Sequence, residues 1–202
     1  MRLKYFGLVM LVVGIVFVVK VHDFLAVSVP VTADILVVEG WIRQASAMRE
    51  VITEFNRGHY TWLVTVGETF EGNGAASSQK NSAELVATRL HELGVNKEGI
   101  IVLPVPSVNF HRTYASALTV HAWLKKSHIK TQGINVFTLG AHARKSLVLF
   151  QRVIGPEVAI GVIAGKDDSY NPDFWWLSPR GNYVIARKTL GYLYAVLWPL
   201  RQ

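Results

Sequence analysis

The feature that most constrains the fold is a repeated alternation of short apolar runs with longer amphipathic stretches. The apolar runs, rich in valine and isoleucine, predict buried strands over 34–40, 61–66, 100–103, 134–139 and 158–163. The stretches between them predict helices over 45–56, 81–93, 112–127 and 141–153. Such alternation indicates a parallel sheet with helices on both faces. We therefore expect an α/β protein, a Rossmann-like three-layer sandwich with a mostly parallel five-stranded sheet.

The N-terminus adds a second constraint. Arg2 and Lys4 precede an uninterrupted apolar segment from Tyr5 to Val19, which ends at Lys20. The segment is shorter than the roughly 20 residues that span a bilayer, but the flanking lysines can extend their ammonium groups outward. A cleaved signal peptide is the alternative, yet no convincing A-x-A-like site follows. We expect residues 1–22 to form one N-terminal transmembrane helix.

The positive charge at the N-terminus favours a cytoplasmic location for that end. We therefore expect a single-pass protein of the inner or cytoplasmic membrane, with an extracytoplasmic globular domain over 33–202. At 202 residues, the chain is long enough for one such domain plus the anchor.

Composition excludes several classes of function. The chain has no cysteine, which rules out disulfides, thiolate nucleophiles and Cys-ligated metals. The formal charge is +7, but the basic residues are scattered and form no stripe with interleaved aromatics. We expect a membrane and an anionic ligand as partners, and no nucleic acid.

The last segment, 173–202, contains three tryptophans and a predicted helix over 181–197. One interpretation is a final helix packed on the sheet. The other is that its aromatics, with Arg180, Arg187 and Lys188, contact the membrane interface near the anchor.

Ligands of open α/β sheets bind outside the carboxyl ends of the strands, where the strand order reverses. Polar residues and glycines follow four of the predicted strands: Glu39, Gly40, Trp41, Arg43, Gly67, Glu68, Asn109, His111, Arg112, Thr113, Gly140, His142 and Arg144. Arginine forks and helix N-termini both suit phosphate or carboxylate oxygens. The residues that we expect to bind an anionic ligand are Gly40, Arg43, Gly67, Arg112, Thr113, Gly140 and Arg144.

His142 and Glu39 are the candidate catalytic residues. The imidazole of His142 titrates near physiological pH, so it could act as a general acid or base or contact a phosphate. The alternative is a histidine hydrogen-bonded to a neighbouring loop. Glu39 is either a general base or ligand anchor in the crevice, or a carboxylate paired with Arg43.

Other patterns are weaker. The segment 71–78 contains G-x-G without the full dinucleotide fingerprint, so we interpret it as a mobile loop. Asp167, Asp168 and Asp173 lack the spacing of a calcium loop and are more typical of a solvated turn. We therefore expect no metal, and the sequence identifies no cofactor.

Over about residues 33–164, the chain resembles the YdcF-like family, which includes SanA-like and ElyC-like envelope proteins. The resemblance rests on ADILVVEGW, VTVGET, NSAELVATRLHELGV, SVNFHRTYASAL and TLGAHARKS. It implies a Rossmann-like fold, frequently a single N-terminal anchor, and a role in envelope or surface-polysaccharide biogenesis. The chain departs from the commoner family form at Asn81-Ser82-Ala83 and at Tyr114-Ala115-Ser116, where polar ligand groups are missing.

These observations lead to three hypotheses. The first is a membrane-anchored protein that binds an anionic, phosphorylated envelope or polysaccharide precursor, as a phosphoryl or glycosyl-phosphate transferase or hydrolase if it is an enzyme. The second is a non-catalytic envelope assembly or regulatory factor. The third is a nucleotide or S-adenosylmethionine binder. The catalytic hypothesis requires Arg112 and Arg144 to point into a common cleft.

Overall fold

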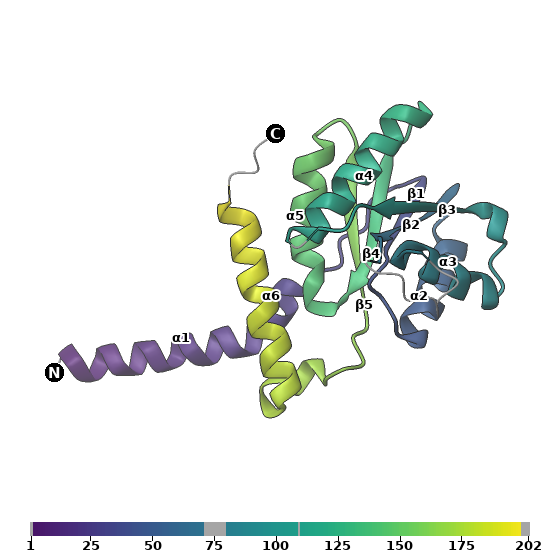
Figure 1. Cartoon of the computed structure of the whole chain (residues 1–202). Coiled ribbons are helices and arrows are strands. Elements are labelled where there is room, and N and C mark those ends of the chain that lie inside the picture. Colours follow the sequence, from purple (N-terminus) through teal and green to yellow (C-terminus); the bar gives the residue numbers. More distant parts are fainter. Residues whose placement is uncertain (1, 71–79, 109, 199–202) are drawn as a thin grey trace.

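The structure is a computed structural model that describes residues 2–70, 80–108 and 110–198 (Figure 1). The strands are β1 (Ile35–Glu39), β2 (Trp62–Glu68), β3 (Ile100–Val105), β4 (Gly133–Leu139) and β5 (Ala159–Gly165). The α-helices are α1 (Arg2–Leu25), α2 (Ala45–Arg57), α3 (Ser82–Glu92), α4 (Arg112–Ser127), α5 (Ala143–Ile154) and α6 (Pro179–Leu197). Three 3-10 helices join them: η1 (Lys97–Gly99), η2 (Gly140–His142) and η3 (Pro172–Leu177).

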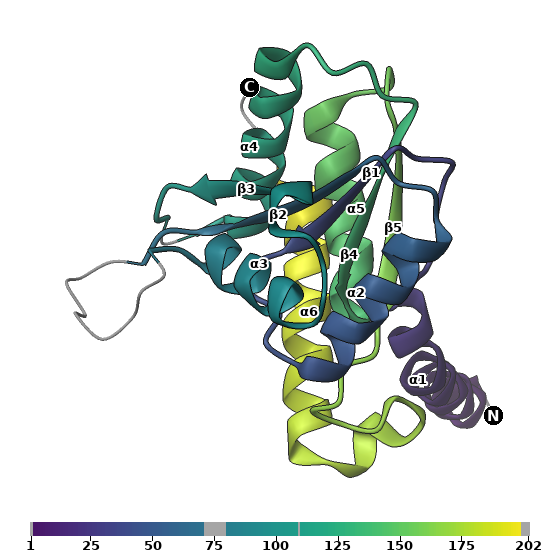
Figure 2. The same ribbon diagram turned by 90° about the vertical axis from the view of Figure 1, so that its right-hand side faces the viewer.

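The expected Rossmann-like α/β architecture is confirmed. The five strands form one sheet in the order β3-β2-β1-β4-β5, and every pair of neighbours is parallel. Helices α2 and α3 cover one face, and α4 and α5 cover the other (Figure 2). The side chains of the central strand, β1, explain why helices cover both faces. Ile35 and Val37 pack toward α4 and α5, while Leu36 and Val38 pack toward α2 and α3, because successive side chains of a strand point to opposite faces.

Several elements differ in length from the prediction. Strand β3 continues through Pro104 to Val105, which an edge strand tolerates because the missing N–H is not needed by a second neighbour. Helix α3 begins one residue later than predicted, because the side chain of Asn81 caps it by accepting from the N–H of Glu84 at 2.8 Å. The helix predicted over 141–153 is preceded by the turn η2, where Gly140 has a φ of +41°.

Helix α1 extends away from the body of the molecule (Figure 1). Only its last turns join the domain, where Val21 and Leu25 are buried in a cluster with Val184 and Ile185 of α6. Within the described residues, no helix has the length and apolar character needed to cross a membrane. The transmembrane helix expected over 1–22 is therefore not supported. The element observed there is a longer helix whose end packs into the protein.

Helix α6 is longer than predicted and begins at Pro179, where the hydroxyl of Ser178 accepts from the N–H of Gly181 at 3.0 Å. It packs on α5, η2 and α1 rather than directly on the sheet. The interpretation of a final helix packed on the sheet is thus corrected: α5 already covers that part of the sheet, so α6 forms a further layer outside it.

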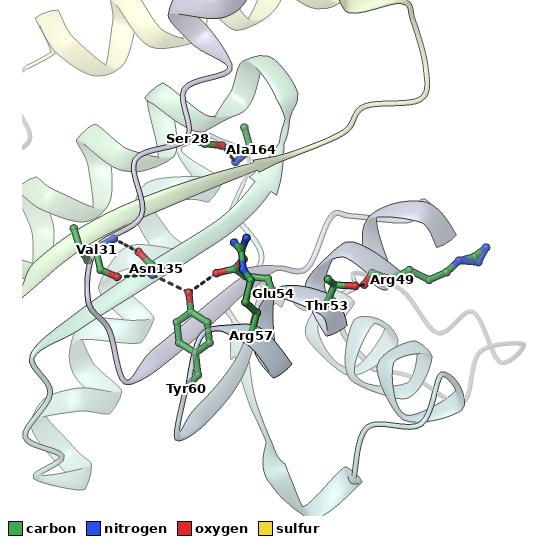
Figure 3. Close-up of polar contacts among 9 residues, drawn as sticks. All are labelled: Ser28, Val31, Arg49, Thr53, Glu54, Arg57, Tyr60, Asn135 and Ala164. Carbon is green, nitrogen blue, oxygen red and sulfur yellow. Dashed lines mark hydrogen bonds and ion pairs between the residues drawn. The ribbon is translucent and has the colours of Figure 1, made fainter.

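The segment between α1 and β1 is held against the sheet by a buried asparagine. Figure 3 shows Asn135 of β4 directed at the backbone of Val31 and the hydroxyl of Tyr60. Its amide oxygen accepts from the N–H of Val31 at 2.9 Å, and its amide nitrogen donates to the carbonyl of Val31 at 2.9 Å and to the Tyr60 hydroxyl at 2.8 Å. The Tyr60 hydroxyl donates in turn to Glu54 at 2.9 Å. Asn135 is the third residue of β4, so this network lies toward the amino ends of the strands.

Candidate functional site

The strand order places a topological switch point between β1 and β4. The chain runs outward from β1 through β2 to β3, and then returns to the other side of β1 as β4. Connections that leave in opposite directions open a crevice between the carboxyl ends of the two strands. Glu39 is the last residue of β1, and η2 with His142 follows β4 directly. Both candidate catalytic residues therefore lie at the switch point.

Glu39 is buried, with 2% of its surface exposed, and its carboxylate is surrounded by hydrogen-bond donors. Its Oε2 accepts from the indole Nε1 of Trp41 at 3.0 Å and from the hydroxyl of Thr138. The hydroxyl of Ser146 lies 3.2 Å from both carboxylate oxygens. Burial raises the pKa of Glu39, and these hydrogen bonds and the positive charge of Lys188 oppose the rise. The Glu39–Arg43 pair is not formed, because Arg43 donates to the carbonyl of Gly40 instead.

His142 is buried beside this carboxylate. Its Nε2 lies 3.7 Å from Oε2 of Glu39 and 3.2 Å from the hydroxyl of Thr113, and its ring meets the Trp41 ring edge-on. The other ring nitrogen, Nδ1, is buried without a hydrogen-bond partner among the described residues. Burial lowers the pKa of His142 well below its ordinary value, and the charge of Lys188 adds to the effect. Both effects oppose protonation, so the imidazole is held in its neutral form.

Two lysines that the sequence analysis did not place in the site belong to this cluster. The ammonium of Lys188 lies 4.5 Å from the centre of the Trp41 ring, and burial lowers its pKa to about 8, with the charge of Glu39 opposing. Burial also lowers the pKa of Lys145, again against the charge of Glu39. A signal existed for Lys188: it follows the buried Val184 and Ile185 at positions i+4 and i+3, which lie on one helix face.

A pocket of about 270 Å³ opens beside Glu39, at the carboxyl ends of β1, β2 and β3. The predicted site residues that line it are Glu39, Gly40, Arg43, Gly67, Arg112 and Thr113. Trp41, Glu68, Ser82 and Ser116 also line it. Two guanidinium groups and three hydroxyls around so small a space are suited to the oxygens of a phosphate or carboxylate.

The two glycines in this wall serve close packing. A Cβ on Gly40 would lie 2.8 Å from the carbonyl oxygen of Val66, and one on Gly67 would lie 2.2 Å from the hydroxyl of Ser82. A Cβ on Gly40 would also lie 2.9 Å from the Cα of Gly67, and one on Gly67 would lie 3.0 Å from the Cα of Gly40. Their lack of side chains therefore brings the first turn of α3 against the strand ends.

The first turn of α4 lines the pocket. Arg112 and Thr113 begin this helix, no side chain caps it, and its first turn contains no acidic residue. Uncapped N–H groups at a helix N-terminus attract anions. The guanidinium of Arg112 is exposed and lies 3.5 Å from Oε2 of Glu68. An anion in the pocket would therefore meet both the helix terminus and Arg112, whose charge Glu68 partly neutralises.

Arg144 and Gly140 lie elsewhere. Arg144 donates from Nε to the carbonyl of Phe24, and its guanidinium lies 3.9 Å from the centre of the Phe24 ring. It thus holds the end of α1 and does not line the pocket. Gly140 forms the left-handed turn of η2 beside Asp167 and Tyr170. Because Arg112 and Arg144 do not share a cleft, the geometry required by the catalytic hypothesis is not present.

The turn that contains Asp167 and Asp168 contacts the start of α2. Asp167 accepts from the side chain of Gln44 at 2.9 Å, and Asp168 accepts from the hydroxyl of Ser46, so this turn fixes the start of α2. Among the residues that the structure describes, no group of acidic or histidine side chains is arranged to hold a metal. Asn109 and the 71–78 segment lie outside the described residues.

A second and more apolar cavity, of about 620 Å³, lies between the first turn of α4, α5 and the end of α6. It is lined by Phe110, His111, Tyr114, Lys145, Leu149, Tyr194, Ala195 and Trp198. The rings of His111 and Tyr194 stack, as do those of Tyr194 and Trp198. No strand-end pattern predicts this cavity, because α6 forms one of its walls.

Comparisons of the chain with protein-family models, with curated proteins and with solved structures find no match. The resemblance to the YdcF-like family therefore rests on the sequence segments quoted above.

Proposed function

We propose that this protein binds an anionic small molecule, carrying a phosphate or carboxylate, in the pocket at the carboxyl ends of β1, β2 and β3. The observation that carries the proposal is the uncapped N-terminus of α4, which lines the pocket with Arg112 and Thr113. Arg43 lines the same pocket and supplies a second guanidinium. The ligand is bound by charge-assisted hydrogen bonds and by helix N–H groups.

Binding fits this geometry better than catalysis. Trp41, Thr138 and Ser146 all donate to the carboxylate of Glu39, so it is a poor general base for a ligand in the pocket. Burial also favours its protonated form. His142 is the remaining group able to move a proton, and Thr113 lies between it and the pocket. A transferase or hydrolase of phosphoryl or glycosyl-phosphate groups is therefore the second candidate.

We further propose that the apolar segment Tyr5–Val19 attaches the protein to a membrane, with the globular domain on the extracytoplasmic side. The support is the uninterrupted apolar sequence between Lys4 and Lys20. With the resemblance to the YdcF-like family, this makes a phosphorylated envelope or polysaccharide precursor the proposed ligand.

The test is a thermal-shift screen of the purified full chain in detergent. Inorganic phosphate, nucleotides, nucleotide sugars, S-adenosylmethionine and phosphorylated lipid-carrier analogues are compared, since a ligand that prefers the folded state raises Tm. Arg112→Ala should weaken binding about 10- to 100-fold, the cost of losing a hydrogen bond to a charged group. Arg49→Ala is the matched control, because Arg49 is exposed on α2 and does not line the pocket.

Arg144→Ala should leave the ligand-induced shift unchanged, since Arg144 contacts Phe24 instead of the pocket. A folded protein whose Tm responds to none of these anions would contradict the proposal. Release of phosphate from a ligand that binds, abolished by His142→Ala, would favour the transferase or hydrolase.

A further inference from the structure

Helix α6 has an apolar face that the other described residues leave exposed. Leu190 and Leu197 are 67% and 78% exposed, and Tyr183 and Leu193 are 56% and 45% exposed. At 100° per residue, these four side chains lie on one side of the helix. The buried Gly181, Val184, Ile185 and Ala195 lie on the other.

This pattern is unusual for a helix at the surface of a globular domain. Such a helix normally turns its apolar side to the core and its polar side to water. In α6 both sides carry apolar residues, so the outer one is an exposed apolar face of the kind that marks an interaction site.

We propose that the outer face of α6, defined by Tyr183, Leu190, Leu193 and Leu197, lies on the surface of an anionic lipid bilayer. The position of the helix supports this partner. Helix α6 is at the side of the body from which α1 projects, and it crosses the base of α1 (Figures 1 and 2). A surface that receives α1 would therefore also meet the outer face of α6.

Helix α1 contributes exposed apolar side chains of its own. Phe6, Met10 and Val16 are each more than half exposed, whereas Val21 and Leu25 are buried against α6. From Val16 to Phe6 the helix rises about 15 Å, at 1.5 Å per residue. Exposed apolar side chains therefore lie along the projecting part of α1 and on the outer face of α6, which crosses the base of α1.

The charges near this face match an anionic surface. Helix α6 contains Arg180, Arg187 and Lys188 and no acidic residue. Arg180 and Arg187 are exposed, as is Lys20 on α1. Lys188 points inward to Trp41, so it belongs to the buried cluster and not to this face. An amphipathic helix with apolar and basic side chains is the usual form of an interfacial membrane helix.

This inference rests on the proposed membrane attachment through α1 and is independent of the ligand.

The absence of cysteine makes the inference directly testable, because each introduced cysteine is unique. Four variants of the full chain, Leu190→Cys, Leu197→Cys, Val16→Cys and Leu93→Cys, carry an environment-sensitive fluorophore. Leu93 is the control, since it is 43% exposed at the end of α3, which covers the opposite face of the sheet from α5. Each is reconstituted with phosphatidylcholine–phosphatidylglycerol vesicles that contain a nitroxide-labelled lipid.

We expect lipid quenching at Leu190, Leu197 and Val16 to exceed that at Leu93 several-fold. Arg180→Glu with Arg187→Glu should reduce quenching at Leu190 and leave Val16 unchanged, with retention of fold checked by circular dichroism. Quenching at Val16 alone overturns the docking of α6 and leaves the attachment through α1 standing. No quenching at any position overturns both, and neither result bears on the thermal-shift screen. If the fluorophore at position 190 is shielded from solvent in a way that depends on protein concentration and not on lipid, the inference is overturned in favour of a second copy of the chain.

Discussion

The Oε2 atom of Glu39 lies 3.7 Å from Nε2 of His142, and both side chains are buried where β1 and β4 diverge. Burial raises the pKa of Glu39 and lowers the pKa of His142. Both shifts disfavour an ion pair between these two residues. The positive charges that act on the Glu39 carboxylate instead belong to Lys188 and Lys145, which were not expected there.

His142→Gln should reduce the loss of unfolding free energy that occurs at acidic pH. Because the folded-state pKa lies below the ordinary 6.5, the unfolded chain binds the proton more tightly, and stability is lost as pH falls from about 6.5 toward the folded pKa. Removing the imidazole removes this loss. Urea unfolding at several pH values between 5 and 8 measures it. His91→Gln is the control because His91 is exposed, and an equal reduction of that loss in both variants would contradict the assignment.

Glu39→Gln should lower the pKa of Lys188 below its present value of about 8. Burial lowers that pKa and the charge of Glu39 raises it. An uncharged isostere removes the raising effect, so the pKa should fall further. The side-chain ¹³Cε resonance of Lys188, followed by NMR against pH, reports the change. Glu92→Gln removes an exposed carboxylate of α3 and should leave the titration unchanged. An unchanged pKa in Glu39→Gln would show that the two groups are not coupled.

Gly67→Ala should destabilise the protein by about 1–3 kcal/mol, the range for overpacking a well-packed core. The added Cβ would lie 2.2 Å from the hydroxyl of Ser82 and 2.8 Å from the N–H nitrogen of Ala83, so the start of α3 has to move. Because Ser82 lines the pocket, ligand binding should weaken as well. Gly99→Ala is the control, since a Cβ there meets nothing within 4 Å. Equal denaturant midpoints for the two variants would contradict this packing role.

Asn135→Ala should destabilise the protein by about 2–3 kcal/mol, because it removes three hydrogen bonds and leaves the partly buried N–H and carbonyl of Val31 unpaired. Chemical unfolding measures the loss. The control is Asn182→Ala. The exposed side chain of Asn182 makes a single hydrogen bond to the carbonyl of Trp176, so this replacement should destabilise the protein by under about 1 kcal/mol. Binding to the pocket should survive Asn135→Ala in the folded protein, since the network lies toward the amino ends of the strands.

Much of the fold follows from local pattern. The strand positions were predicted because β-branched runs that are buried on both faces leave a continuous apolar signature in the sequence. The boundaries shifted by a few residues where caps and turns intervene, as at Asn81 and Gly140. The location of Glu39 and His142 at one sheet edge also followed, since parallel strands bring their carboxyl ends together.

The partners of these residues required the tertiary structure. Thr113 and His142 are 29 positions apart and meet only because α4 packs against α5, which follows η2 directly. Arg144, two residues after His142, turns to Phe24, and Lys188 reaches Glu39 from the last helix. Periodicity determines which residues form each element and which side of it is apolar. The rotation and docking of each helix depend on contacts between distant segments, and these contacts decide which charged groups share a site.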